Sequence, residues 1–261
     1  MSRAIILGSG AAPGVPSVSG GWGACNPNNP KNKRQRAGVY LTDGTTQILI
    51  DTSPDLKNQL IANNIKVVDG VLYTHTHADH LHGIDDLRGI TRNTKKSLKF
   101  YATAQQIEEI KERFRYAFAN VEHSDITNHP ELLPVEIEYN KDFQIGSFKI
   151  KPLEFTGHTM ITTGYSFNDG QLVLVPDFKS MPEPTLSYLQ QIDVNVLIMP
   201  LTILHEGSYH AGIDIILKYA SQIKAKQVVL THMATECDYD EVMKLTPENM
   251  EPAFDNMMIE F

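Results

Sequence analysis

The stretch "THTHADHLHG", residues 74–83, constrains this chain more than any other feature, because it places four histidines and one aspartate in ten positions. The chain has only ten histidines among 261 residues, so this concentration needs a physical cause. A turn that leaves a strand can aim His75 and His77 at one point. Asp79 and His80 then turn toward a second point nearby. Imidazole and carboxylate groups bind zinc, manganese and iron, so the stretch indicates a metal site rather than a solvated patch or a chance cluster.

Three further metal donors each follow an apolar strand elsewhere in the chain. They are His158 in "FTGHT", Asp177 in "LVLVPDF" and His232 in "VVLTHM". A lone histidine at a strand end is usually a hydrogen-bonded or surface residue, but an unpaired buried carboxylate at Asp177 would be costly. A site for two metals needs about seven ligands, and the three residues complete that number. His82 begins the next expected helix and is not counted as a ligand.

Alternating apolar strands and amphipathic helices predict one α/β domain over residues 1–261, with two strand-rich halves and helices outside. The expected strands are 5–7, 38–44, 45–51, 70–74, 97–102, 135–139, 147–155, 162–177, 194–200 and 226–232, with turns at 43–44 and 168–170. The expected helices are 53–64, beginning with a capping Ser53, then 83–90, 103–118 and 211–223. Residues 120–134 are expected to be irregular, and the tail 241–261 to be mixed.

Residues 8–36 are rich in Gly, Pro, Ser and Asn, which predicts a long loop. Its opening "GSGAAPG" is not a dinucleotide-binding fingerprint, because Pro13 and Pro16 exclude the helix that must follow. The glycine-rich opening is better explained by a turn that lets the backbone approach the metals. The basic run "KNKRQR" is either a solvated loop or a phosphate clamp in which Arg34 or Arg36 contacts substrate.

Composition narrows the class of protein. Lys and Arg number 23 against 31 Asp and Glu, a net charge of −8, which argues against a partner such as a long nucleic acid. The two cysteines, Cys25 and Cys237, form no CxxC pair, so a reducing cytoplasm is expected. No apolar run reaches the roughly 20 residues that span a bilayer, and the first residues lack a secretory pattern. We therefore expect a cytoplasmic protein with no membrane partner.

"THTHADH", together with the downstream "GHT", "PDF" and "LTH", resembles the metallo-β-lactamase superfamily over essentially the whole chain. The resemblance implies a four-layer αββα sandwich of two mixed sheets with helices outside. It also implies two divalent metal ions, zinc or manganese, with iron compatible. On the family's pattern His75, His77 and His158 hold one ion, Asp79, His80 and His232 hold the other, and Asp177 bridges them. Asp51 in "ILIDTS" matches the family's aspartate that orients a ligand histidine, its alternative being a helix N-terminal acid.

"LGSGAAPGVPS", "GWGAC" and "KRQRAGVYL" resemble the subgroup typified by the carbon–phosphorus lyase accessory phosphodiesterase, which hydrolyses a cyclic phosphate of ribose. "LHEGSYHAGID" resembles the subgroup's segment that carries a general-acid histidine. His210 matches best and His205 is second, as a substrate contact. The resemblance makes Asp79 and His210 the catalytic pair. The subgroup has several cysteines in this loop that hold a structural zinc. Only one cysteine, Cys25, is present here, so no such zinc is predicted.

These patterns predict a metal-dependent hydrolase that acts on a small cyclic or linear phosphodiester. Hydroxide held by the metals attacks phosphorus, and His210 protonates the leaving alkoxide. Three alternatives stay open: a glyoxalase II-like thioester hydrolase, a tRNase Z-like nuclease, and a non-catalytic metal-binding module. The sequence leaves open the native metal, the organic part of the substrate, the pathway, and whether the protein is a homodimer.

Overall fold

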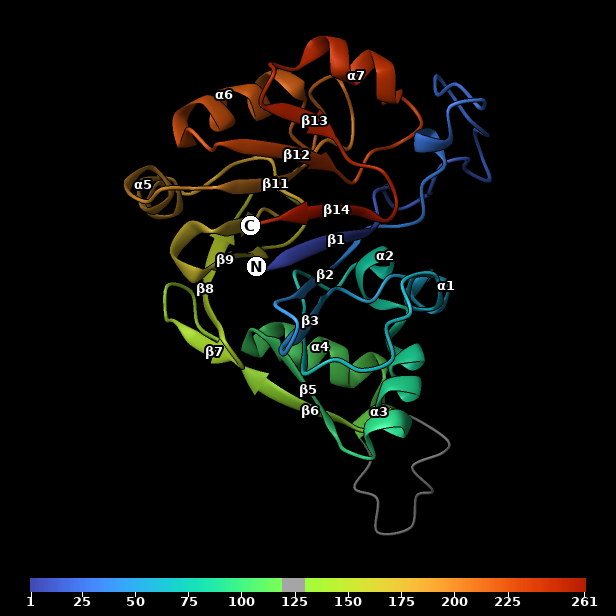
Figure 1. The fold of residues 1–261 in the computed structure, drawn as a ribbon, viewed down its shortest axis with the longest axis vertical. Coiled ribbons are helices and arrows are strands. Elements are labelled where there is room, and N and C mark those ends of the chain that lie inside the picture. The colour runs from blue at the N-terminus through green and yellow to red at the C-terminus, as the bar shows by residue number, and fades with distance from the viewer. Residues whose placement is uncertain (119–129) are drawn as a thin grey trace.

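Two seven-stranded sheets lie face to face at the centre of the protein (Figure 1). This computed structural model describes residues 1–118 and 130–261. The first sheet has the order β14 (Met257–Glu260), β1 (Arg3–Gly8), β2 (Gly38–Thr42), β3 (Gln47–Ile50), β4 (Gly70–Leu72), β5 (Leu98–Ala102) and β6 (Leu132–Glu136). The second has the order β13 (Met250–Pro252), β12 (Gln227–Thr231), β11 (Val196–Pro200), β10 (Leu172–Leu174), β9 (Thr162–Phe167), β8 (Phe148–Phe155) and β7 (Phe143–Ile145). Both mix parallel and antiparallel pairs.

Helices cover the outer face of each sheet (Figure 1). The first sheet carries α1 (Leu56–Ala62), α2 (Ala78–Leu81), α3 (Arg88–Thr94) and α4 (Ala104–Arg113). The second carries α5 (Glu183–Gln191), α6 (Ile213–Ile223) and α7 (Tyr239–Leu245). One apolar cluster fills the space between the sheets, and two more pack each sheet against its helices. The predicted αββα sandwich is therefore confirmed.

Burial explains why these segments adopt these structures. β2 and β9 are buried at every position, as expected for strands covered on both faces. On α6 the buried residues Ile216, Ala220 and Ile223 are spaced by four and three positions, which places them on one face toward the second sheet. Thr103 caps α4 by accepting a hydrogen bond from the backbone N–H of Gln106, whose side chain accepts one from Thr103 N–H.

The structure corrects several expected boundaries. The hairpin at residues 43–44 is confirmed, since β2 and β3 pair antiparallel around it. The first helix begins at Leu56, and Ser53 does not cap it, because Asp55 holds the N-cap position without a side-chain cap. The irregular segment expected at 120–134 already contains β6 from Leu132, while residues 120–129 lie outside the described part. The tail beyond residue 240 contributes a helix and two strands.

Short 3-10 turns account for the remaining helical segments, at Pro30–Asn32, Ile84–Leu87, Arg115–Phe118 and Asn168–Gly170. The expected helix over 83–90 is therefore a 3-10 turn followed by α3. Among the described residues, no helix is both long enough and apolar enough to cross a membrane.

The long loop expected at residues 8–36 contains one 3-10 turn and is tied to the C-terminal part of the chain. Asp238 makes that connection at the N-cap of α7. Its Oδ1 accepts hydrogen bonds from the backbone N–H groups of Asp240 and Glu241, at 3.0 and 3.2 Å. Its Oδ2 accepts from Asn26 N–H at 2.9 Å and from Asn32 Nδ2 at 2.7 Å. One carboxylate therefore caps a helix and fixes the loop.

We expect Asp238→Asn to lower the free energy of unfolding by about 2 kcal/mol at pH 7, because its amide nitrogen cannot accept the loop's two hydrogen bonds. Burial alone would raise the pKa of Asp238, but the hydrogen bonds from Asn26, Glu241 and Asn32 lower it overall. The stabilisation is thus present above the ordinary aspartate pKa of about 3.9 and is lost as the pH falls through the folded-state pKa.

Urea titrations of the wild type and the variant at pH 7 and at pH 3 measure this difference. Asp214→Asn, which changes an exposed acid in the first turn of α6, serves as the matched control. A stability gap that stays the same at pH 3, or an equal loss in the control, contradicts the role of Asp238.

Candidate metal centre

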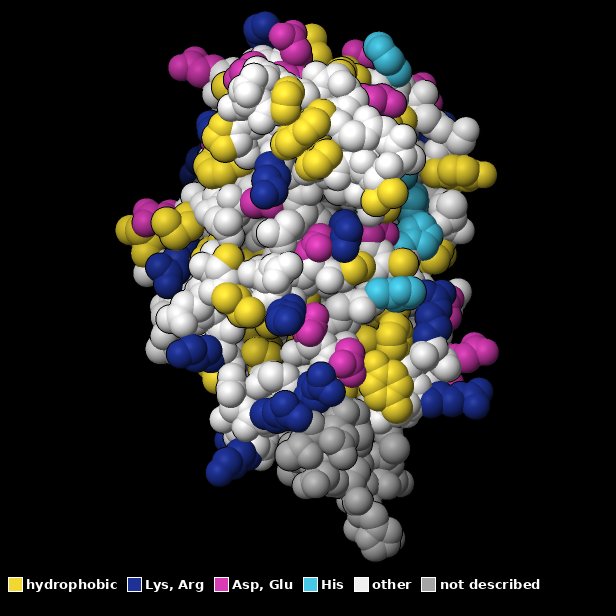
Figure 2. Space-filling model, turned by 90° about the vertical axis from the view of Figure 1, so that its right-hand side faces the viewer, with side chains coloured by type: hydrophobic (Ala, Val, Ile, Leu, Met, Phe, Trp, Pro, Cys, Tyr) yellow, Lys and Arg dark blue, Asp and Glu magenta, His cyan; other side chains and the backbone are white. Residues whose placement is uncertain are grey.

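All seven predicted metal ligands lie together at one edge of the sandwich, where the parallel strands of both sheets end. His75 and His77 follow β4, Asp79 and His80 lie in α2, His158 lies between β8 and β9, Asp177 follows β10, and His232 follows β12. Histidine side chains gather on the face of the molecule that Figure 2 shows. The structure therefore brings together donors that span more than 150 positions of sequence.

Three histidines form the first donor group. Nδ1 of His77 lies 3.1 Å from Nε2 of His75 and 3.0 Å from Nε2 of His158. Gly157 makes the last approach feasible, because it has φ of +80° and an added Cβ would lie 2.8 Å from Cβ of Lys179. The His75–His77–His158 donor atoms all lie within 4.8 Å of one another, which suits a single ion.

The second donor group consists of Asp79, His80 and His232, all buried. Nε2 of His232 lies 3.2 Å from both Nε2 of His80 and Oδ2 of Asp79. His80 Nε2 lies 3.3 Å from the same Asp79 oxygen. These three atoms thus surround a point different from the centre of the first group.

Asp177 lies between the two groups. It can share an ion with His75 and His80, and also with His158 and His210. Its Oδ2 is 3.7 Å from His80 Nε2, and its Oδ1 is 3.3 Å from His232 Nδ1. The side chain is buried, so it can contact both groups of donors but little solvent.

The outward-facing nitrogens of these histidines show that the donor set fits metal ions. His158 Nδ1 lies 3.0 Å from the carbonyl oxygen of Tyr209, so it carries the proton and donates. His80 Nδ1 donates likewise to Asp51 Oδ2 at 2.7 Å. In a neutral ring the inner nitrogen, Nε2, then has a free lone pair. Orientation of this kind by outer partners is typical of metal-binding histidines.

Asp51 organises the turn that carries the ligands. Its Oδ1 accepts a hydrogen bond from Thr74 N–H at 2.8 Å, and its Oδ2 accepts from Thr74 Oγ1 at 2.8 Å besides the one from His80. Thr74 Oγ1, having donated its proton, accepts from His75 Nδ1 at 2.9 Å. Asp51 does not cap a helix, since α1 begins at Leu56. One carboxylate therefore orients ligands of both donor groups.

Backbone strain accompanies this arrangement. Asp51 and His232 adopt φ of +62° and +55°, in the left-handed region that non-glycine residues rarely occupy. Each of them directly follows a strand, β3 and β12 respectively. Strained residues of this kind are retained where the surrounding structure fixes them, commonly at functional sites.

The carboxylates and histidines balance one another's charge. Burial alone would raise the pKa of Asp79 and of Asp177, but the neighbouring His80 and His232 lower both overall. Burial alone would lower the pKa of His80, but Asp79 and Asp51 raise it overall. Burial lowers the pKa of His75 well below its usual range. The carboxylates thus create a negative field that favours cations at this point.

A cavity of about 350 Å³ opens onto the donors. Its walls come from three parts of the chain: the long loop supplies Ala11 to Pro13, the segment after β11 supplies Thr202, Tyr209 and His210, and the ligands supply the floor. The predicted general acid His210 therefore borders the cavity. Its ring centroid lies 4.8 Å from that of His158.

Thr202, which the sequence analysis did not identify, positions two histidines. Its hydroxyl lies 3.0 Å from Nδ1 of His232 and 3.2 Å from Nδ1 of His210. A single hydroxyl can accept from one ring and donate to the other. No sequence pattern marks a threonine 30 positions before its partner, so this contact becomes visible only in the fold.

The structure does not bring the predicted substrate contacts Arg34, Arg36 and His205 to this cavity. Arg34 is 2% exposed, and its guanidinium bonds Asn32 at 3.1 Å and Cys25 Sγ at 3.7 Å. Arg36 forms an ion pair with Asp55 at 2.8 Å, and His205 is exposed outside the lining. Because Arg34 packs inward, it belongs to the core of the loop rather than to a phosphate clamp.

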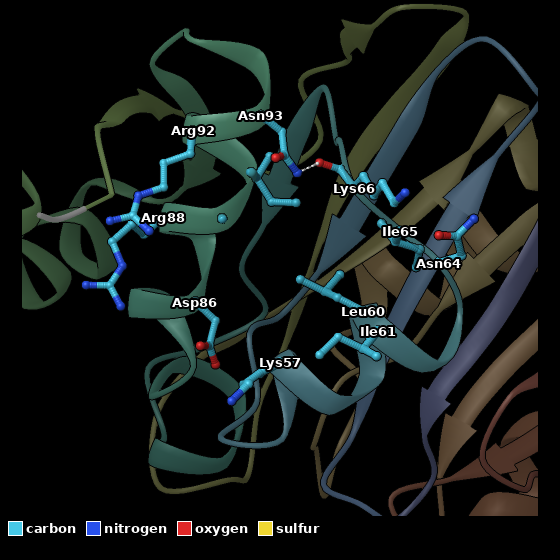
Figure 3. Close-up of a pocket in the computed structure, with 12 residues that line it drawn as sticks. Lys57, Leu60, Ile61, Asn64, Ile65, Lys66, Asp86, Arg88, Arg92 and Asn93 are labelled. Carbon is cyan, nitrogen blue, oxygen red and sulfur yellow. Dashed lines mark hydrogen bonds between the residues drawn. The ribbon is translucent and has the colours of Figure 1, made fainter. Parts of the chain in front are cut away.

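A separate cavity of about 520 Å³ lies between α1 and α3 (Figure 3). Lys57, Asp86, Arg88 and Arg92 line it together with apolar residues of both helices, and Asp86 points toward Lys57. None of the seven metal-donor residues contributes to its lining. This cavity is therefore not the metal centre.

Comparison with known proteins gives three informative similarities. The sequence pattern of the beta-lactamase superfamily domain matches residues 46–233. An octanoyltransferase of Porphyromonas gingivalis is 28% identical over 98% of this chain, but the chain spans only about half (51%) of that protein's length. A ribonuclease Z of Pediococcus pentosaceus is 23% identical over 82% of this chain and 86% of its own length.

Among solved structures, the crystal structure of a new diphosphatase from the PhnP family superposes with a TM-score of 0.87 and 26% identity. The match covers 100% of this chain and 98% of that one. The two molecules therefore share the complete sandwich, including the segments that carry the donors.

We expect Asp51→Asn to weaken metal binding about 10–100-fold, because an amide cannot accept from both Thr74 and His80 as the carboxylate does. Competition of the metal-free protein against a chromophoric chelator measures the affinity. The exposed Asp193→Asn is the matched control. Equal affinities of the two variants would show that Asp51 does not orient the ligands.

Proposed function

Because this chain belongs to the β-lactamase superfamily and is a metal-dependent hydrolase, we propose that it cleaves a small phosphodiester with two divalent ions in the centre described above. The division of the donors into two groups with Asp177 between them is the observation that carries this proposal. Three donors in each group and one carboxylate shared between the groups suit a pair of ions better than a single ion, which binds about four protein ligands.

The residues fit zinc or manganese, and iron accepts the same donors. Bound at this place, such ions supply Lewis acidity toward a phosphoryl oxygen and a nucleophilic water near neutral pH. Asp79, His80 and His232 would hold one ion, and His75, His77 and His158 the other. The histidines' outer hydrogen bonds keep each ring oriented throughout a reaction.

His210 is proposed to donate a proton to the leaving oxygen. Three observations support this role: the residue borders the cavity, it lies beside His158, and the Thr202 hydroxyl fixes its Nδ1. Its remaining nitrogen, Nε2, is then the proton donor. Asp79 would act through the ion that it would hold, and it completes the proposed catalytic pair.

The substrate is proposed to be small. A cavity of about 350 Å³ lies within the range of about 300–1,000 Å³ that is usual for small-molecule sites. The net charge of −8 disfavours a long polyanion, which separates the proposal from a tRNase Z-like nuclease. The diphosphatase among the similar structures suggests that a phosphoanhydride belongs in the same assay panel. We also propose a cytoplasmic location, on the basis of two free thiols.

The function is tested with protein loaded separately with zinc and with manganese. The panel contains a cyclic ribose phosphate, bis(4-nitrophenyl) phosphate, a dinucleoside diphosphate and S-lactoylglutathione. We expect phosphodiester hydrolysis that chelation abolishes and that Asp177→Asn loses together with most bound metal. Thioester hydrolysis without phosphodiester hydrolysis would instead support the glyoxalase II-like alternative.

Replacement of the proposed proton donor tests its role. His210→Gln should keep bound metal and lose about 10²–10⁴-fold in kcat on an alkyl leaving group, which needs a proton. On bis(4-nitrophenyl) phosphate the loss should be far smaller, because nitrophenolate leaves unprotonated. The exposed His205→Gln is the matched control. Equal losses on both substrates would remove the assignment.

A further inference from the structure

A second cleft, of about 470 Å³, adjoins the metal centre at His77. It is lined by residues of the ligand turn and of the C-terminal end of α4, namely Thr76, His77, Ala78, His82, Arg113 and Phe114. His77 lines both this cleft and the cavity over the metal donors. A substrate whose phosphate lies at the donors can therefore extend past His77 into the second cleft.

Two flat rings form one wall of this cleft. The ring centroids of His82 and Phe114 are 5.6 Å apart, with an angle of 80° between the planes. His82 is exposed and Phe114 is half-buried, so ring surface remains accessible to a ligand. His82 belongs to the histidine-rich stretch, yet it is in none of the candidate metal-donor groups. Its position beside the Phe114 ring makes it available to contact a ligand instead of a metal ion.

Arg113 supplies hydrogen-bond donors to the same cleft. Its Nη1 donates to the carbonyl oxygen of Thr76, and its Nη2 lies 3.3 Å from Oε2 of Glu109. A guanidinium has five N–H donors and a flat face that stacks on rings, so these two contacts leave part of it for a ligand. The side chain is 40% exposed.

Resting on the proposed function, we propose that this cleft binds the nucleobase of a nucleoside that is esterified to the phosphate at the metal centre. A nucleobase is flat and carries carbonyl and ring-nitrogen acceptors. It can therefore stack on Phe114 or His82 and accept hydrogen bonds from Arg113. A nucleobase uses both the ring faces and the guanidinium donors, whereas a simple alkyl group has no acceptor for the guanidinium.

The charge of the cleft favours a base over a second phosphate. The carboxylate of Glu109 lies against Arg113 and also accepts a hydrogen bond from Thr76 Oγ1 at 2.5 Å. The arginine is thus already partly neutralised, and a phosphate dianion beside it would meet this carboxylate. A neutral ring with acceptor atoms meets no such repulsion.

The experiment compares two substrates that share one leaving group. Thymidine 5′-(4-nitrophenyl phosphate) carries a base, whereas methyl 4-nitrophenyl phosphate does not. The metal-loaded wild type should prefer the nucleoside ester about tenfold or more in kcat/KM, because stacking on an aromatic side chain contributes about 1–3 kcal/mol per base. Phe114→Leu and His82→Gln should each reduce this preference several-fold.

Arg115→Gln and Lys111→Gln are the matched controls, since neither residue lines the cleft and both neighbour it in sequence. Both should retain the wild-type preference. Thermal unfolding of Phe114→Leu checks its fold, and the exposed His82 gives a second variant that is independent of packing. Equal kcat/KM values on the two esters in the wild type, or a preference that survives both variants, would overturn this proposal alone. No turnover of either ester would overturn the proposed function together with it.

Discussion

The hydrogen bonds on the outer nitrogens of the ligand histidines are the interactions on which the rest of the site depends. Asp51 holds His80, the carbonyl of Tyr209 holds His158, and Thr202 holds His232. The carboxylate and the carbonyl can only accept, so they fix which nitrogen carries the proton and aim the other lone pair inward, while the Thr202 hydroxyl holds the His232 ring in place. Without these partners the same rings would be free to turn, and several imidazoles within about 3 Å of one another would not converge on a cation.

Those partners come from different layers, so the sandwich and the site form together. Asp51 follows the first sheet's β3, whereas Thr202 follows the second sheet's β11. The backbone N–H of Thr163 donates to Thr74 O at 2.8 Å, and the Tyr165 hydroxyl donates to Tyr73 O at 2.6 Å. These bonds join β9 to the end of β4, beside the apolar cluster between the sheets. Packing of that cluster therefore sets the separation of the donors.

The sequence predicted the donors that a local pattern marks and missed the contacts between segments that are distant in sequence. The HxHxDH pattern lies within six residues, and each remaining donor lies within three residues of the end of an apolar strand, so Asp177 and His232 could be identified without coordinates. Thr202 could not, because its partner His232 lies 30 positions away, after a different strand. The phosphate clamp suggested for Arg34 was wrong for a related reason, because the charge of a residue does not show that its side chain is buried against Asn32. Ser53 was predicted to cap the first helix, but α1 begins at Leu56 and Asp55 holds its N-cap position.

Since the donors are shared across a large superfamily, the rim of the site has to determine the substrate. Three separate segments form it here: the long loop at Pro13, the segment around Tyr209, and the C-terminal end of α4 at Phe114. Such rim segments can change without disturbing the hydrogen bonds that aim the ligands. This separation allows proteins similar to this chain to be named as a ribonuclease and as a diphosphatase. Arg113 is the exception, because it donates a hydrogen bond to the Thr76 carbonyl between His75 and His77, so the proposed base contact would be coupled to the geometry of the metal centre.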